Sequence, residues 1–152
     1  RIFYLDREVI TRIARGRRKI KTEIEDNEMC FACGEDNPIG LKLDFELNDD
    51  VVEATFIPRE VHQGFAGVIH GGLLSTLLDE AMANLFHLQE LKAVTAKMEI
   101  KFRQPASIGE KLTITGWIER EKKRTVNTAA EVVNQNQEQV AEAEAVFIKQ
   151  DE

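Results

Sequence analysis

The sequence predicts an α+β fold in which a curved antiparallel sheet packs against one long helix. Three observations support this prediction. Residues 71–89 have apolar side chains at helical spacing, the segments on either side alternate apolar and polar residues, and the later segments are joined by short connections. Consecutive strands with short connections pair antiparallel, and a lone helix then covers one face of their sheet.

The composition is that of an ordinary globular domain. The chain has 152 residues, of which 43% are hydrophobic and 31% are charged. No apolar run approaches the roughly 18 residues of a membrane-spanning helix, and the charged N-terminus lacks the apolar stretch of a secretory signal. We therefore expect a cytoplasmic protein that makes no membrane contact.

A basic segment opens the chain. Residues 1–22 carry a net charge of +6, whereas the remainder carries −13. Loosely helical apolar spacing predicts a basic N-terminal helix or arm over 1–28, followed by the main domain over 29–152. The acidic body argues against extensive nucleic-acid contact, although the arm could touch phosphate or an acidic partner.

A hairpin is predicted after a loop. The sequence CFACGEDNPIG, residues 30–40, is rich in turn-forming residues. Residues 41–47 then alternate apolar and polar side chains, NDD forms a turn, and the run 51–57 ends at Pro58. The next segment, REVHQGFAG, is expected to be irregular.

The central helix is predicted from residue 71 to about residue 89. Its expected buried positions are Leu74, Leu77, Leu78, Ala81 and Leu85. The following strands are expected at 94–102, 112–118, 126–133 and 140–148. A single helix leaves one sheet face and the sheet edges uncovered, so we expect a homodimer or homotetramer.

The two cysteines form one CxxC pair, Cys30 and Cys33. A structural zinc site has four ligands, and the three histidines of the chain lie at none of the usual spacings. The sequence therefore predicts reduced thiols, no metal site and no organic cofactor.

The start of the central helix has the composition of an oxyanion-binding site. Gly71 and Gly72 fall in its first turn, where backbone N–H groups have no helical partner and a ligand oxygen can approach closely. Asp79 borders the apolar stripe, where burial would make its carboxylate more basic. Glu80 is expected to lie at the exposed edge of the helix.

The segment HGGLLSTLLDEAM resembles the His-Gly-Gly-x(6)-Asp signature of hotdog-fold acyl-CoA thioesterases, in the PaaI-type and human-thioesterase-superfamily branch. CFACGEDNPIGLKL, HQGFAGVIHGG, VTAKMEIKFRQPASIGEKL and VAEAEAVF resemble the same branch. The resemblance covers about residues 29–149. It implies a hotdog fold, an acyl-CoA substrate and a dimer that shares its active sites.

The resemblance also implies roles for four residues. Gly71 would donate the N–H that binds the thioester oxygen, and His70 would orient the thioester or the glycine turn. Asp79, from the other protomer, would attack the carbonyl or activate water. Thr95 would help to hold that water. A thiolate leaves easily, so thioester hydrolysis suits such a sparse site.

Further substrate contacts are expected around these residues. Many family members have Asn six residues before the signature histidine, where this chain has Gly64. His62 and Gln63 lie nearby and are candidates to position water or substrate. A CoA diphosphate requires basic partners, for which Arg103 and Arg124 are candidates beside Lys122 and Lys123.

Two other functions compete with hydrolysis. The basic arm would suit an acyl-CoA-binding regulatory module, in which a hotdog domain senses a ligand for a DNA-linked segment. The arm is too short for a complete helix-turn-helix. A hotdog dehydratase or hydratase is a weaker match, because His70 opens the helix that carries Asp79, as it does in the thioesterases.

Overall fold

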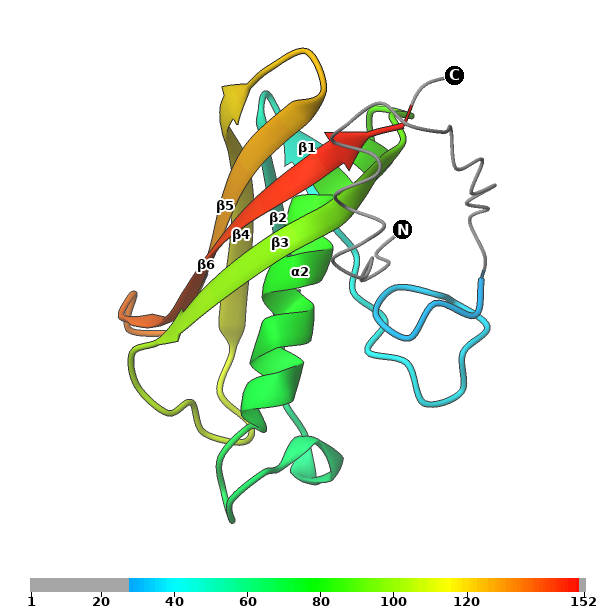
Figure 1. Ribbon diagram of the computed structural model, residues 1–152. Coiled ribbons are helices and arrows are strands. Elements are labelled where there is room, and N and C mark those ends of the chain that lie inside the picture. Colours follow the sequence, from blue (N-terminus) through cyan, green and yellow to red (C-terminus); the bar gives the residue numbers. More distant parts are fainter. Residues whose placement is uncertain (1–27, 151–152) are drawn as a thin grey trace.

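A curved sheet wraps one long helix (Figure 1). The computed structural model describes residues 28–150. Within that range, six strands in the order β1-β2-β4-β5-β6-β3 pack against helix α2 (Gly71–His87). Every neighbouring pair is antiparallel, which confirms the predicted α+β arrangement. The expected N-terminal helix lies outside the described residues.

Strands β2 to β6 agree closely with the alternating segments of the sequence, whereas β1 does not. The six strands are β1 (Glu46–Asn48), β2 (Val51–Phe56), β3 (Ala93–Phe102), β4 (Leu112–Glu121), β5 (Thr125–Val133) and β6 (Gln139–Lys149). The NDD turn joins β1 to β2 as predicted, with Asp49 at a φ of 54°. Strand β4 runs three residues beyond its predicted end at residue 118, into the charged EREKKR segment.

The first predicted strand is shorter than expected. Leu41, Leu43 and Phe45 are buried in alternation, but only residues from Glu46 onward pair with β2. The N–H groups of Leu41 and Leu43 instead donate to carbonyl oxygens of the preceding loop, at 2.8 and 2.9 Å. Lys42 adopts a φ of 56°, which interrupts the extended backbone. The alternation therefore marks buried side chains of a covering segment rather than a sheet strand.

Helix α2 supplies the centre of the core. All five predicted positions are buried, and Leu77, Leu78, Ala81 and Leu85 are completely so. Val52, Ile114, Val132 and Phe147 from the inner face of the sheet belong to the same cluster. The ring centroids of Phe86 and Phe147 are 4.8 Å apart. Burial of this apolar stripe positions the helix on the sheet.

The segment 28–45 contributes to the same core. Its Ala32, Leu41, Leu43 and Phe45 are buried in the cluster that contains α2, and its two cysteines pack against that cluster. The periodicity of the helix does not predict this contribution. The segment 28–45 buries side chains of α2 that would be exposed if the helix packed against the sheet alone.

The chain crosses the sheet between β2 and β3. Strand β2 lies next to one end of the strand order, whereas β3 forms the opposite end and pairs with β6. The short η1 turn (Glu60–His62) and helix α2 connect them. Among residues 28–150, no helix is long and apolar enough to cross a membrane.

Candidate active site

The start of α2 is held by His70. This residue is the N-cap, with extended backbone at φ −64° and ψ 132°, and its Nδ1 accepts a hydrogen bond of 2.8 Å from the N–H of Gly72. The imidazole ring thus takes the place of the usual small capping side chain. Among residues 28–150, the N–H of Gly71 donates to no protein acceptor. This N–H is therefore the donor available at the helix start.

The two glycines have different reasons to be glycine. A Cβ at Gly72 would lie 2.9 Å from His70 Nδ1, so any side chain there would displace the capping ring. A Cβ at Gly71 would meet only the ring of Phe102, at 3.6 Å, which is an ordinary contact. The fold itself leaves room for a side chain at Gly71. Its absence keeps the approach to the N–H open.

The loop before the helix is ordered by the residues expected to touch substrate. Gln63 donates to the carbonyl oxygen of Glu60 at 2.9 Å and accepts from the N–H of Gly67 at 2.6 Å. His62 is buried against Phe56, and its Nδ1 accepts from the N–H of Arg59 at 2.9 Å. Burial and then the positive charge of Arg59 lower the pKa of His62.

These contacts support His70 indirectly. The N–H of His70 donates to the carbonyl oxygen of His62 at 2.9 Å, and a Cβ at Gly64 would lie 3.2 Å from His70. Gly64 thus permits the loop to pass close to the capping residue. In this structure His62 and Gln63 hold the loop that carries His70, and their side-chain hydrogen bonds are with that loop.

Asp79 lies inside the molecule, beside Thr95 of β3. The carboxylate residue is 8% exposed and the threonine 2%. Thr95 Oγ1 donates a long hydrogen bond of 3.4 Å to Asp79 Oδ1. Burial, followed by the negative charge of Glu80, raises the pKa of Asp79 to about 7, while the Thr95 hydrogen bond lowers it. A base with such a pKa is balanced between its two protonation states at neutral pH.

A β-bulge brings Thr95 to this position. Simple alternation through β3 places Thr95 on the opposite face from the apolar side chains. In the structure, Thr95 pairs with Phe147 and Lys97 pairs with Val146, so Ala96 is an extra residue. Phe147 faces the core, and Thr95 therefore faces it too. The predicted pairing of Thr95 with Asp79 is present within one chain.

The expectation that Glu80 lies at an exposed edge is wrong. Glu80 is 2% exposed, and Asn84 Nδ2 donates to its Oε1 at 3.2 Å and to its carbonyl oxygen at 2.9 Å. The reason is the covering segment 28–45, which lies over this side of α2 and which helical periodicity does not reveal. Glu80 adds a second carboxylate next to Asp79.

The helix start and the buried acid do not meet in one chain. Gly71 and Asp79 are eight positions apart on a continuous helix, or about 12 Å at 1.5 Å per residue. One carbonyl group cannot contact both. The chain thus presents two separate candidate groups, one at the exposed helix start around Gly71 and one buried at Asp79.

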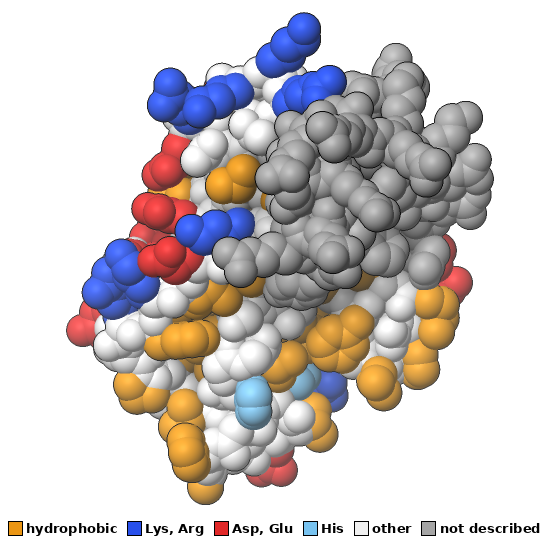
Figure 2. Space-filling view, viewed as in Figure 1, with side chains coloured by type: hydrophobic (Ala, Val, Ile, Leu, Met, Phe, Trp, Pro, Cys, Tyr) orange, Lys and Arg blue, Asp and Glu red, His pale blue; other side chains and the backbone are white. Residues whose placement is uncertain are grey.

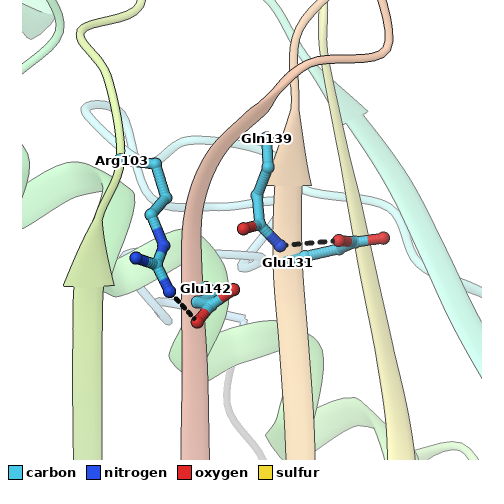
Figure 3. Close-up of polar contacts among 4 residues, drawn as sticks. All are labelled: Arg103, Glu131, Gln139 and Glu142. Carbon is cyan, nitrogen blue, oxygen red and sulfur yellow. Dashed lines mark hydrogen bonds and ion pairs between the residues drawn. The ribbon is translucent and has the colours of Figure 1, made fainter.

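The two candidate arginines lie at opposite ends of the sheet. Arg103 directly follows β3, at the end where the Phe102 ring approaches Gly71, whereas Arg124 lies in the β4–β5 turn. Arg103 forms a 2.6 Å ion pair with Glu142, which lowers the pKa of that carboxyl (Figure 3). Gln139 and Glu131 form a second polar contact beside it, at 3.0 Å.

These contacts border a hollow of about 230 Å³ on the sheet. Its lining includes Trp117, Glu131, Glu142 and Glu144, which alternate with the core-facing residues of β4, β5 and β6. The hollow therefore lies on the sheet face away from α2. It is separate from both Asp79 and the helix start, and acidic side chains dominate its charge.

Apolar side chains are exposed around the helix start. Near the helix start, Phe65 is 88% exposed and Val61 is 76% exposed. Phe102 and Ile57 are each more than half exposed. Figure 2 shows hydrophobic side chains gathered around the histidines in the lower part of this face. Such a patch is typical of a surface that contacts a ligand or another protein chain.

Comparisons with known proteins agree on one family. The family model described as "Thioesterase superfamily" matches residues 66–141 of this chain. Acyl-coenzyme A thioesterase PaaI of Escherichia coli (strain K12) is 39% identical over 72 residues, which are 47% of this chain and 51% of that protein. Acyl-coenzyme A thioesterase 13 of Homo sapiens is 32% identical over 78 residues, or 50% and 56%. The chain spans about half the length of the curated relatives it matches.

Solved structures share the fold. The E. coli PaaI protein superposes with a TM-score of 0.67 at 29% identity, over 72% of this chain and 80% of that one. A hypothetical thioesterase protein with coenzyme A from Streptococcus pneumoniae TIGR4 has a TM-score of 0.67 at 22% identity, over 70% and 84%. The expected hotdog architecture is thereby confirmed.

Proposed function

Because the chain belongs to the thioesterase superfamily, we propose that it hydrolyses acyl-CoA thioesters to a carboxylic acid and free CoA. The observation that carries this proposal is Asp79, a buried carboxylate beside a hydroxyl, with its pKa raised to about 7. The matched PaaI and thioesterase 13 proteins are named acyl-coenzyme A thioesterases, which supports the same substrate class.

The helix start provides electrostatic assistance. The Gly71 N–H, at the positive end of the α2 dipole, binds the thioester carbonyl oxygen and stabilises the negative charge that develops on it. His70 acts through Gly72, by holding the first turn of the helix in place. His70 and Gly72 are thus positioning residues, and Gly71 is the group that contacts the reacting atoms.

The acid provides the oxygen that attacks, either directly or through water. In the water route, Asp79 accepts a proton as the water oxygen bonds to the carbonyl carbon, and Thr95 orients the water. The C–S bond then breaks, and CoA leaves as a thiolate that takes up a proton. In the direct route, Asp79 bonds to the carbonyl carbon, the C–S bond breaks to release CoA as a thiolate, and water then hydrolyses the resulting anhydride.

Each site requires two copies of the chain. Gly71 and Asp79 are too far apart in one chain to contact one carbonyl, so Asp79 of one protomer would face the helix start of its partner. The exposed apolar patch around Phe65, Val61 and Phe102 supports this arrangement, because a second copy or an acyl chain would cover it. We propose a homodimer, alone or within a tetramer.

The CoA diphosphate would bind at the rim of the helix start. Arg103 is the better placed of the two candidate arginines, since it follows Phe102, whose ring lies next to the Gly71 position. Its contact with phosphate would replace its ion pair with Glu142. The S. pneumoniae neighbour, whose structure includes coenzyme A, supports CoA as the ligand class.

A panel of acyl-CoA esters tests the activity, with released thiol measured in wild type and Asp79→Asn. Hydrolysis by wild type and its loss in the variant would support the proposal. If the protein bound CoA esters but did not hydrolyse them, the thioesterase proposal would be wrong and the alternative of an acyl-CoA-binding regulatory module would be favoured.

Mixed dimers test the shared site. Asp79→Asn and Gly71→Val should each be inactive alone, but random mixed dimers would contain one intact site. Activity should then recover to about a quarter of the wild-type value, as two-fold symmetry requires. If the two variants refold and dimerise together without recovery, the two halves do not come from different protomers.

A further inference from the structure

The CxxC pair lies against helix α2, at the residue that follows Asp79. One ligand atom from each of Cys30, Cys33 and Glu80 lies within 4.8 Å of the others. The two cysteines are half-buried and not joined in a disulfide, and Glu80 is 2% exposed. Two elements that are distant in sequence thus bring two thiols and a carboxylate to one point.

The turn that carries the thiols is tightly constrained. The N–H of Gly34 donates to the carbonyl oxygen of Cys30 at 2.8 Å, which closes the turn. A Cβ at Gly34 would lie 2.3 Å from the carbonyl oxygen of Glu28 and 2.4 Å from the nitrogen of Cys30. No larger residue fits there. Ala32, between the cysteines, is buried in the core and fastens the turn to the domain.

Polar contacts brace the rest of the loop. Lys42 Nζ donates to the carbonyl oxygens of Gly34 and Asn37, at 3.1 and 2.6 Å. The Asn37 amide donates to the carbonyl oxygen of Met29 and accepts from the N–H of Ile39, both at 3.0 Å. The backbone that carries the thiols is therefore held in place by hydrogen bonds within the loop, as a preformed binding site requires.

We propose that Cys30, Cys33 and Glu80 bind a zinc ion. Zinc prefers thiolate, imidazole and carboxylate ligands in tetrahedral geometry, at about 2.0–2.3 Å from the metal. Ligand atoms at these distances are roughly 3.5–4 Å apart, so a separation of up to 4.8 Å closes with a small movement. Thiolates disfavour magnesium and calcium, which take oxygen ligands.

The carboxylate distinguishes this site from a redox pair. A reversible Cys30–Cys33 disulfide needs only the two thiols, whereas a Glu80 carboxylate oxygen also lies within 4.8 Å of both sulfur atoms. Three protein ligands leave the fourth position for water or another donor. The ion links the segment 28–45 to the centre of α2, so it raises the stability of the folded domain. This proposal departs from the expectation of no metal, which rested on the four ligands of a structural zinc site and on the spacing of the histidines.

Cobalt is the probe for the site, because its spectrum reports thiolate ligands and tetrahedral geometry. The full chain is reduced, stripped with a chelator and titrated with Co²⁺. We expect thiolate-to-metal absorption that is about halved in Cys30→Ser and Cys33→Ser and lost when both are changed. Glu80→Gln should weaken the affinity at least tenfold, whereas Glu144→Gln on the outer sheet face should not change it.

Zinc should also stabilise the protein. With free zinc at about a hundred times its Kd, Tm should rise by roughly 5–10 °C in wild type, but not in the double cysteine variant. A wild-type spectrum without thiolate absorption would overturn the proposal, as would equal affinity in Glu80→Gln. If Glu80→Gln does not fold, the cysteine variants decide the outcome. Air oxidation to a disulfide without metal uptake would assign the pair to redox chemistry instead.

Discussion

The two halves of the proposed site are built in different ways. The helix start is exposed, and its His70–Gly72 contact is formed by residues two positions apart. The acid half is buried, and its Asp79–Thr95 contact joins α2 to an edge strand, sixteen positions away. The first half is determined by local sequence, the second by packing of the whole domain. Substitutions in the two halves should therefore differ in how they change the rate of hydrolysis and the thermal stability of the protein.

The largest effect is expected from Asp79→Asn. The amide cannot act as a base or nucleophile, so hydrolysis should fall by about 10³-fold. The same change removes a buried charge, so Tm measured above pH 7 should rise or stay the same. Thiol release and thermal unfolding are measured together, with Glu144→Gln as the control that changes neither. A large loss of Tm would show that the loss of rate reflects misfolding.

The pH dependence of the rate should report Asp79 directly. Burial raises its pKa from 3.8 to about 7, so the ionised form is populated above pH 7 and depleted below it. In chelator-treated protein, kcat/KM should therefore fall about tenfold per pH unit below 7 and level off above it. A flat profile down to pH 5 would mean that Asp79 is not the base.

Alanine at the two glycines should separate fold from chemistry. Gly72→Ala displaces the His70 ring and should lower Tm by a few degrees, together with a loss of rate. Gly71→Ala has room in this chain, so Tm should be maintained or raised while kcat/KM falls about tenfold, because the thioester oxygen is held away from the N–H. If both variants lose rate and stability in parallel, Gly71 has no specific catalytic role.

The smallest effect is expected from Thr95→Val. The valine keeps the shape but removes the donor to Asp79, so kcat/KM should fall several-fold, about tenfold at most. The Thr95 hydrogen bond lowers the pKa of Asp79, so its loss should move the midpoint of the pH profile upward. Thr95→Ser should restore the midpoint. An unchanged midpoint in Thr95→Val would exclude this hydrogen bond from the mechanism.

The sequence predicted the parts of the fold that depend on local patterns. The apolar positions of α2 and the alternation of β3 to β6 are visible in the chain, and both are confirmed. The bulge at Ala96 was missed because alternation assumes a regular strand, and Thr95 shares its face with Phe147 only because of that bulge.

Burial by distant segments was also missed. The local sequence around Glu80 predicts a polar residue at the edge of the helix, but the segment 28–45 lies over α2 and buries it. The approach of Glu80 to the cysteines depends on the same packing. The glycine signature, by contrast, was readable because its geometry is local. The features that the sequence did not predict, such as the burial of Glu80, depend on packing between segments far apart in the chain rather than on local propensity.

The position of β3 in the sheet has a consequence for folding kinetics. Among the described strands, β3 pairs with β6 alone, and β6 comes last in chain order. Thr95 cannot be fixed against Asp79 until β6 has joined the sheet, which requires contacts between residues far apart in the chain. We therefore expect the acid half of the site to form late in refolding, after α2 has become helical. Hydrogen exchange during refolding would show late protection in β3 and β6, whereas early protection there would contradict this order.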